Sequence, residues 1–343
     1  MTCKLTFLPV GNADSIVIQT ENSTIIVDLG KLNVLEEWLE THEILKIDRI
    51  YITHTHQDHS PPLIELVSFI DTWRKKIKID KIHLPYRAIE IEKKKLNSKN
   101  FKKKDQLRIA LKRIIDLVNN CDITVSVIVR DGEEYSEGQL KIEALHPSQV
   151  YIESYLSSNP NVISIVLRVI YGKFTALLLA DIENQGITQL LSFLKKKSKC
   201  NDFTTNVVKI PHHGAWPSNG DELSELLTFI DAEIAVLSVG SKNKYGHVKP
   251  KLFQALIELQ QNNNKRMNKF ICTEVTRTCV KSASEQSQME KSGLPQQKLC
   301  AGEITILAQT SGNWELKTET EHQKVIEDIK YAACQNRLDL SNL

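Results

Sequence analysis

The chain has 343 residues, of which 41% are hydrophobic, and a formal net charge of +2, so it is long enough to bury a large core. It contains no run of roughly 18 apolar residues that would cross a membrane, and its first residues lead into a strand pattern without a signal peptide. We therefore expect a cytoplasmic protein without a membrane span. The seven cysteines include no Cys-x-x-Cys pair, so we expect reduced thiols, mostly in the core.

Strand and helix patterns alternate along the first third of the chain. The predicted elements are strands over residues 5–9, 15–19, 24–28, 50–52 and 79–85, and helices over residues 32–45 and 63–73. Ser60-Pro61-Pro62 is typical of a helix start. Residues 53–59 therefore form a tight loop between a buried strand and a helix.

Residues 87–119 differ from the rest in composition, because lysines gather there beside an apolar stripe at helical spacing. We predict a helical insertion over about residues 86–120 that lies on the main domain. Its lysines are candidates for contacting nucleic-acid phosphates, and a solvated helix face is the alternative. The candidate residues are Lys93, Lys94, Lys95, Lys102, Lys103 and Lys104.

The alternation of strands and helices continues to the end of the chain, without a recognisable linker or repeat. The predicted strands cover residues 123–129, 140–145, 162–171, 174–180, 206–210, 233–239, 269–275 and a hairpin over 303–317, and the predicted helices cover residues 185–196, 222–229, 251–261 and 323–337. A polar loop is expected over residues 282–297. These patterns alone indicate an α/β or α+β fold. We expect one domain over residues 1–320, with a final helical segment, 321–343, packed on it.

The loop over residues 53–59 carries three histidines and one aspartate within six positions. Burying these groups without a partner would be unfavourable, and a metal would satisfy them together. His54 and His56 point to the same side of an extended chain and can bind one ion, while Asp58 and His59 can reach a second. Imidazole and carboxylate ligands without thiolate suit zinc, with manganese or iron as alternatives. An exposed histidine-rich loop is the non-functional interpretation.

The pattern His54-x-His56-x-Asp58-His59 resembles the signature of the metallo-β-lactamase superfamily. Over roughly residues 4–60 and 140–275, the sequence more narrowly resembles the hydrolase domain of ComEC-type DNA-uptake competence proteins. This resemblance implies a four-layer αββα sandwich of the α+β class, here as a stand-alone soluble chain. It also implies a dinuclear metal site that hydrolyses phosphodiesters, most naturally those of DNA, as a nuclease does.

Asp181 ends an apolar strand, where the family places the carboxylate that bridges the two metals. An aspartate that caps the following helix is the alternative. Leu179-Ala180 stands where the family usually has Thr-Gly, which is a departure at the turn before the bridging residue.

Three further histidine positions match the ComEC-type pattern. His212 and His213 precede a glycine, and we expect His212 to complete the shell of the first metal. His213 is then expected to orient substrate, to donate a proton or to support the ligands from behind. His247 matches the histidine that closes the second site in that family. Val248 stands where the relatives often have proline. His146 competes for a ligand position, because other branches of the superfamily take a histidine between the metal loop and the bridging aspartate.

Several polar residues are expected to support the site rather than bind metal. The resemblance implies that Asp14 and Asp28 hold the metal loop by hydrogen bonds, with a turn-forming role as the alternative for Asp14. Asn161 and Ser164 are expected to fix a loop beneath the site. The remaining histidines, predicted to be surface or structural residues, are His42, His83 and His322.

The expected mechanism follows from the pair of ions, which lower the pKa of a water between them towards neutrality. Asp58 or Asp181 would take up the proton. The leaving group would receive a proton from His213, Lys242 or Lys209.

Two other functions remain open from the sequence. A small-molecule hydrolase would act on a cyclic nucleotide, a phosphorylcholine ester, a lactam or a thioester. A non-catalytic binding subunit would lack some of the ligands, and none is missing. A redox di-iron protein is disfavoured, because that branch usually carries a carboxylate where His56 stands. The sequence also leaves open whether the protein has a protein partner.

Overall fold

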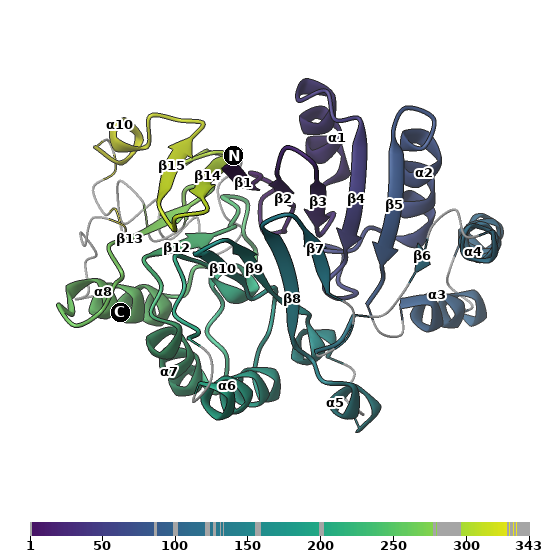
Figure 1. Ribbon diagram of the computed structural model, residues 1–343. Helices are drawn as coiled ribbons and strands as arrows, with labels where there is room; N and C mark the ends of the chain where they lie inside the picture. The colour runs from purple at the N-terminus through teal and green to yellow at the C-terminus, as the bar shows by residue number, and fades with distance from the viewer. Residues whose placement is uncertain are drawn as a thin grey trace.

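Figure 1 shows the computed structural model, in which two mixed β-sheets face each other and helices cover their outer faces. The structure describes residues 2–334, except for residues 86–87, 99–101, 121–123, 126–127, 131, 133, 155–158, 199–201, 277–278, 280–295, 328, 330–331 and 333. Within these described residues, none of the helices has the length and apolar character that a membrane crossing requires.

The first sheet has eight strands in the order β15-β14-β1-β2-β3-β4-β5-β6. Its strands are β1 (Thr2–Phe7), β2 (Ile16–Gln19), β3 (Thr24–Val27), β4 (Lys46–Tyr51), β5 (Lys78–His83), β6 (Thr124–Val125), β14 (Ile304–Gln309) and β15 (Trp314–Thr318). Strands β1 to β3 form an antiparallel meander, whereas β3, β4, β5 and β6 pair in parallel.

The second sheet has seven strands in the order β13-β12-β11-β10-β9-β8-β7. Its strands are β7 (Tyr135–Glu137), β8 (Leu140–His146), β9 (Val166–Tyr171), β10 (Phe174–Leu178), β11 (Val207–Lys209), β12 (Ile234–Leu237) and β13 (Lys269–Cys272). Strands β10 to β13 are parallel. Their carboxyl ends therefore meet at one edge, which is where open α/β sheets place ligands.

Helices cover each sheet on the side away from the other sheet (Figure 1). Near the first sheet lie α1 (Leu32–Thr41), α2 (Leu63–Trp73), α3 (Ala88–Asn97) and α4 (Lys104–Asn119). The remaining helical segments are α5 (Gln149–Ser154), η1 (Pro160–Ile163), α6 (Gln185–Lys197), η2 (Pro211–Gly214), α7 (Gly220–Ile230), α8 (Pro250–Gln261) and α10 (His322–Glu327). Of these, α6, α7 and α8 lie on the outer face of the second sheet.

The apolar side chains form three layers between these four layers of structure. Along β3, Ile25 and Val27 point into the core between the sheets, whereas Ile26 packs in the core under α1, α2 and α4. Along β10, Ala176 faces the inter-sheet core and Leu177 faces the core under α6, α7 and α8. This two-residue alternation confirms the predicted α+β, four-layer sandwich.

Most predicted elements occur, with shifted ends. The helix predicted over residues 32–45 ends at Thr41, because Glu43 adopts a left-handed conformation with φ +50° and the chain then turns into β4. The patterns did not predict β7, α5 or η1. The last predicted helix is observed as α10 only to Glu327, and most of its remainder lies outside the described residues. So does most of the polar loop predicted over residues 282–297.

The lysine-rich insertion contains two helices. The apolar stripe of α4 is buried beside α2, and Arg113 of α4 binds Asp71 of α2 through Nη2 at 2.7 Å and Nε at 3.0 Å. Helix α3, by contrast, has no buried residue among those described. The helical prediction is therefore correct, and α4 attaches the insertion to the first sheet.

Candidate metal centre

A cleft of about 450 Å³ lies where the ends of β4, β11 and β12 come together. The metal loop follows β4, and Asp181 lies three residues after Leu178, the last residue of β10. The cleft is lined by Asn12, His56, Gln57, Asp58, His212, His213, Tyr245 and His247. Asn12 and His247, which are 235 positions apart in the sequence, thus line the same cleft.

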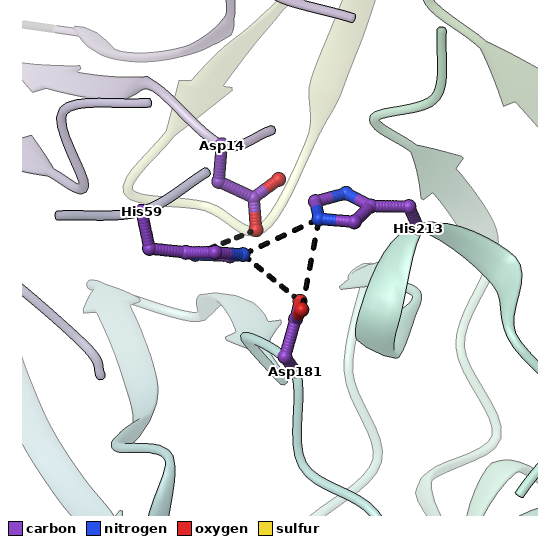
Figure 2. A group of neighbouring side chains, drawn as sticks. All are labelled: Asp14, His59, Asp181 and His213. Atoms are coloured by element: carbon purple, nitrogen blue, oxygen red, sulfur yellow. Dashed lines mark hydrogen bonds and ion pairs between the residues drawn. The ribbon is translucent and has the colours of Figure 1, made fainter. Parts of the chain in front are cut away.

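Asp181 lies at the middle of the predicted ligands and is fully buried. Its carboxylate oxygens lie 3.0 Å from Nε2 of His59 and 3.6 Å from Nε2 of His213 (Figure 2). Nε2 of His54 is 3.9 Å away. Neither oxygen accepts a well-aligned hydrogen bond from the described residues. Burial would raise the pKa of Asp181, but the surrounding histidines more than offset this and hold the pKa well below its usual value.

His59 is oriented by the residue predicted to support it. Its Nδ1 atom is 2.6 Å from Oδ2 of Asp28, and the Asp28 carboxylate also accepts hydrogen bonds from the backbone and hydroxyl of Thr53. Burial lowers the pKa of His59, but Asp181 and Asp28 raise it well above its usual value. Because Nδ1 is engaged by Asp28, Nε2 points into the site, as in histidines that bind metals.

His213 lies inside the same group, although the sequence favoured its neighbour as the ligand. Its Nδ1 atom is 2.9 Å from the carbonyl oxygen of Ser238, and its Nε2 atom is 3.3 Å from Nε2 of His59 and 3.5 Å from Oδ2 of Asp58. Burial would raise the pKa of Asp58, but the contact with His213 and the charge of His59 hold it below its usual range. With Asp14 and Asp181, His59 and His213 form one group whose ligand atoms lie within 4.8 Å of one another.

His54, His56 and Asp58 form a second such group. His54 is buried, and its Nε2 atom has no hydrogen-bond partner among the described residues. Burial and the neighbouring His59 lower the pKa of His54 well below its usual value, which favours the neutral ring. A neutral imidazole with an unused lone pair is the form that binds a metal ion.

His212 and His213 are consecutive, and both have φ +50°, so their rings diverge. The Nε2 atom of His212 lies 3.8 Å from Oδ2 of Asp181, and its Nδ1 atom is 2.9 Å from Glu183. Burial lowers the pKa of His212, but Glu183 and Asp181 raise it above its usual value. Asn161 places its side-chain nitrogen 3.5 Å from this ring.

His247 and His146 lie outside both groups. The His247 ring is 5.5 Å from the His212 ring, and burial together with the nearby histidines lowers the pKa of His247 to about 3. His146 is buried with Nδ1 2.9 Å from the carbonyl oxygen of Ser164, and burial lowers its pKa to about 4. Ser164 thus contacts His146 through its backbone.

The two lysines considered as proton donors have different surroundings. Lys209 is fully buried, pairs with Asp14, and donates to the carbonyl oxygen of Ala180 at 3.0 Å. Its Nζ atom is also 3.9 Å from Asp181, so its charge offsets two buried carboxylates. Lys242 is exposed and does not line the cleft.

Two tight backbone positions shape the loops around Asp181. Ala180 has φ +47°, and its carbonyl oxygen accepts a hydrogen bond from the backbone of His212 at 2.9 Å. At Gly30, a Cβ atom would lie 2.3 Å from the carbonyl oxygen of Asp58 and 2.8 Å from that of Asp14. Glycine is therefore required where these two loops meet.

The donor set fits divalent metal ions. Imidazole nitrogens and carboxylate oxygens converge without a thiolate, which suits zinc, manganese or iron. The buried oxygens of Asp181 and the Nε2 atom of His54 lack other partners within the described part of the chain. Unpaired buried groups of this kind are unfavourable unless a ligand satisfies them. The metal identity and the assignment of each ligand stay predictions.

Sequence reasoning missed two residues of the site. Glu183, which binds His212, follows the bridging position in an Asp-x-Glu pattern that offered a weak signal. Tyr245 lines the cleft beside His247. Among the lysines predicted to contact nucleic acid, Lys95 lines a hollow that also involves the metal loop, and Lys93 and Lys94 lie on the same helix. Lys102 and Lys103 precede α4, which begins at Lys104.

Parts of this chain are similar to known proteins. No family model matches the chain. A ribonuclease Z from Pyrococcus abyssi (strain GE5 / Orsay) is 34% identical over 93 residues, which are 27% of this chain and 30% of that protein. The chain thus matches less than a third of that relative's length.

Two solved structures illustrate the structural similarity. The metallo-β-lactamase fold protein YhfI from Bacillus subtilis has a TM-score of 0.42 at 14% identity, over 69% of this chain and 87% of that one. The short form of human tRNase Z has a TM-score of 0.41 at 16% identity, over 69% of this chain and 92% of that one.

Proposed function

We propose that this protein is a dinuclear metal-dependent hydrolase of nucleic-acid phosphodiesters. The observation that supports this most directly is the convergence of four imidazole Nε2 atoms, those of His54, His59, His212 and His213, within 4 Å of the buried Asp181 carboxylate. These four imidazoles and the carboxylate are more ligands than one ion needs. A carboxylate that lies among two sets of imidazoles suits a pair of ions.

Residues of the two groups, together with His212, which belongs to neither group, would divide between the ions. His54, His56 and His212 would hold one ion, and Asp58, His59 and His213 would hold the other, with Asp181 between them. This arrangement makes both members of the His212-His213 pair ligands. His247 lines the same cleft outside both groups and is left to face the substrate.

Divalent ions bound there would supply a nucleophilic hydroxide at neutral pH and positive charge for the phosphate. The chain's own part is to orient and balance these groups. Asp28 fixes the ring of His59, Ser238 fixes that of His213, and Glu183 fixes that of His212. Asp58, which lines the cleft, is the candidate acceptor for the proton of the attacking water. Lys242, which the sequence suggested as a donor to the leaving group, lies outside the cleft lining.

DNA is the substrate that the ComEC-type resemblance implies, and we propose it first. RNA is the second candidate, because the matched relative is a ribonuclease Z. Lys95 lies beside the metal loop, but its ammonium group pairs with Glu92, so it adds little support for a polyanionic substrate of either kind.

The test measures bound metal and then cleavage of linear, circular and single-stranded DNA and of RNA. We expect cleavage by the wild type, none by the His56→Ala/Asp58→Ala variant, and unchanged cleavage by His42→Ala, whose exposed ring stacks on Trp38 away from the cleft. Bound metal without cleavage of any nucleic acid would contradict the proposal and favour a small-molecule hydrolase. A native protein that takes up no metal would favour a binding subunit.

A further inference from the structure

Tyr245 presents a flat aromatic surface at the candidate metal centre. It lies in the loop between β12 and α8, and 56% of the residue is exposed. Its ring lines the same cleft as His56 and Asp58. Tyr51, Tyr135 and Tyr171 are buried, so exposure is not general among the described tyrosines.

Single exposed aromatic residues are common on protein surfaces, so exposure alone does not indicate a ligand. The Tyr245 ring is also held in place. It stacks on His247 with ring centroids 5.8 Å apart and an interplanar angle of 20°. Its backbone carbonyl accepts a hydrogen bond from Nζ of Lys249 at 2.8 Å, and the backbone nitrogen of His247 donates to Asn243 at 3.1 Å. A fixed ring loses little conformational freedom when it binds a partner.

The loop around this ring is positively charged. Residues 241–250 include Lys242, Lys244 and Lys249 and no acidic residue. Lys242 and Lys244 are exposed, and Nζ of Lys244 lies 4.9 Å from the centroid of the Tyr245 ring. Sites for single-stranded nucleic acid combine these two features, because bases stack on aromatic rings while cations contact the phosphates.

We propose that Tyr245 binds an unpaired nucleobase of the substrate by stacking, with Lys242 and Lys244 contacting the phosphates beside the hydrolysed bond. This rests on the proposed function of the same cleft. A base in an intact duplex has both faces covered by its neighbours, so the inference specifies an unpaired nucleotide. That nucleotide belongs either to a single strand or to a free mononucleotide, and the two share the chemistry that the ring recognises.

The test is a binding cycle in the Asp58→Asn background, which removes hydrolysis from the measurement while metal is supplied. Binding of a short labelled single-stranded oligonucleotide, its abasic counterpart and a mononucleotide is measured by fluorescence anisotropy and competition. Tyr245→Ala should weaken binding of the normal oligonucleotide roughly ten-fold, the scale of one lost stacking contact. Tyr245→Phe should retain binding, because the ring is kept.

The abasic oligonucleotide separates stacking from a structural role. If Tyr245 stacks on a base, Tyr245→Ala has no further effect on abasic binding. An equal loss with and without bases would overturn the inference and make Tyr245 a support for His247. Competition by mononucleotides as strong as by oligonucleotides would identify the free nucleotide as the source. Base-dependent binding without any hydrolysis by the wild type would contradict the proposed function and leave only the stacking of Tyr245 on a base.

Discussion

Nδ1 of His59 lies 2.6 Å from Oδ2 of Asp28, and this contact directs the opposite ring nitrogen towards the centre of the site. The two residues are 31 positions apart and come from the loops after β4 and β3, which are parallel neighbours in the first sheet. The pairing of the strands therefore sets the orientation of a candidate ligand before any metal binds.

Replacing Asp28 with asparagine should weaken metal binding without unfolding the chain. The amide no longer provides a charged acceptor for His59, so we expect metal affinity to fall about 10- to 100-fold. Metal affinity is measured by calorimetric titration, and circular dichroism checks that the variant is folded. Asp48→Asn is a matched control, because Asp48 is also buried and accepts a backbone hydrogen bond, from Thr24 at 2.9 Å. Equal metal affinity in Asp28→Asn and the wild type would contradict the assigned role.

Lys209→Met should be strongly destabilising, because it leaves the buried Asp14 carboxylate without its cation. We expect the free energy of unfolding to fall by about 3–5 kcal/mol, measured by urea denaturation. The double variant Asp14→Asn/Lys209→Met should recover part of this loss. In contrast, Lys195→Met should cost at most about 1 kcal/mol, because the Lys195–Glu225 pair is exposed. If Lys209→Met lowered the free energy of unfolding no more than Lys195→Met does, the buried Lys209–Asp14 pair would not be needed for stability.

Ala180→Gly should stabilise the protein slightly. The left-handed φ of +47° costs an L-residue roughly 1–2 kcal/mol, and the greater freedom of glycine in the unfolded chain offsets about 0.4–1 kcal/mol. We therefore expect a net gain between zero and about 1.6 kcal/mol in chemical denaturation. Gly30→Ala is the opposite change and should destabilise, since its Cβ would collide with the Asp58 backbone. A loss of stability in Ala180→Gly would contradict this account of the turn.

Stability should fall in mild acid partly through His322. Burial, with a smaller effect of Lys269, lowers the pKa of His322 to about 4, whereas an unfolded histidine has a pKa of about 6.5. Unfolding therefore takes up a proton between these values, and the free energy of unfolding drops as pH falls from about 6.5 towards 4. His322→Gln should show a smaller drop between neutral and acidic pH in urea titrations with chelator. The control His42→Gln changes an exposed histidine. If stability falls as much in His322→Gln as in the wild type and in this control, His322 makes no such contribution.

Local patterns predicted most of the architecture because apolar alternation is a local property. Residues 24–28 alternate between two cores, and the strand they predict is β3, with its last residue at Val27. The end of α1 was missed, because it depends on the left-handed Glu43, a position where the sequence has no glycine. Strand β7 has only three residues, too few to give a periodic signal.

The site was less accessible to sequence reasoning, because its geometry depends on contacts between distant loops. The metal loop was recognised from its own spacing, and the positions after β10 and β11 came from the resemblance. The pairing of Lys209 with Asp14, across 195 positions, leaves no local pattern. The divergence of His212 and His213 likewise depends on two left-handed residues in succession, so the choice between them could not be predicted.

The most direct test of the central claim is the metal content of the purified protein, measured by inductively coupled plasma mass spectrometry beside an Asp181→Asn variant. We predict about two divalent ions per chain in the wild type and clearly fewer in the variant, with both proteins folded. A folded wild type that carries no divalent metal and takes none up on titration would contradict the account.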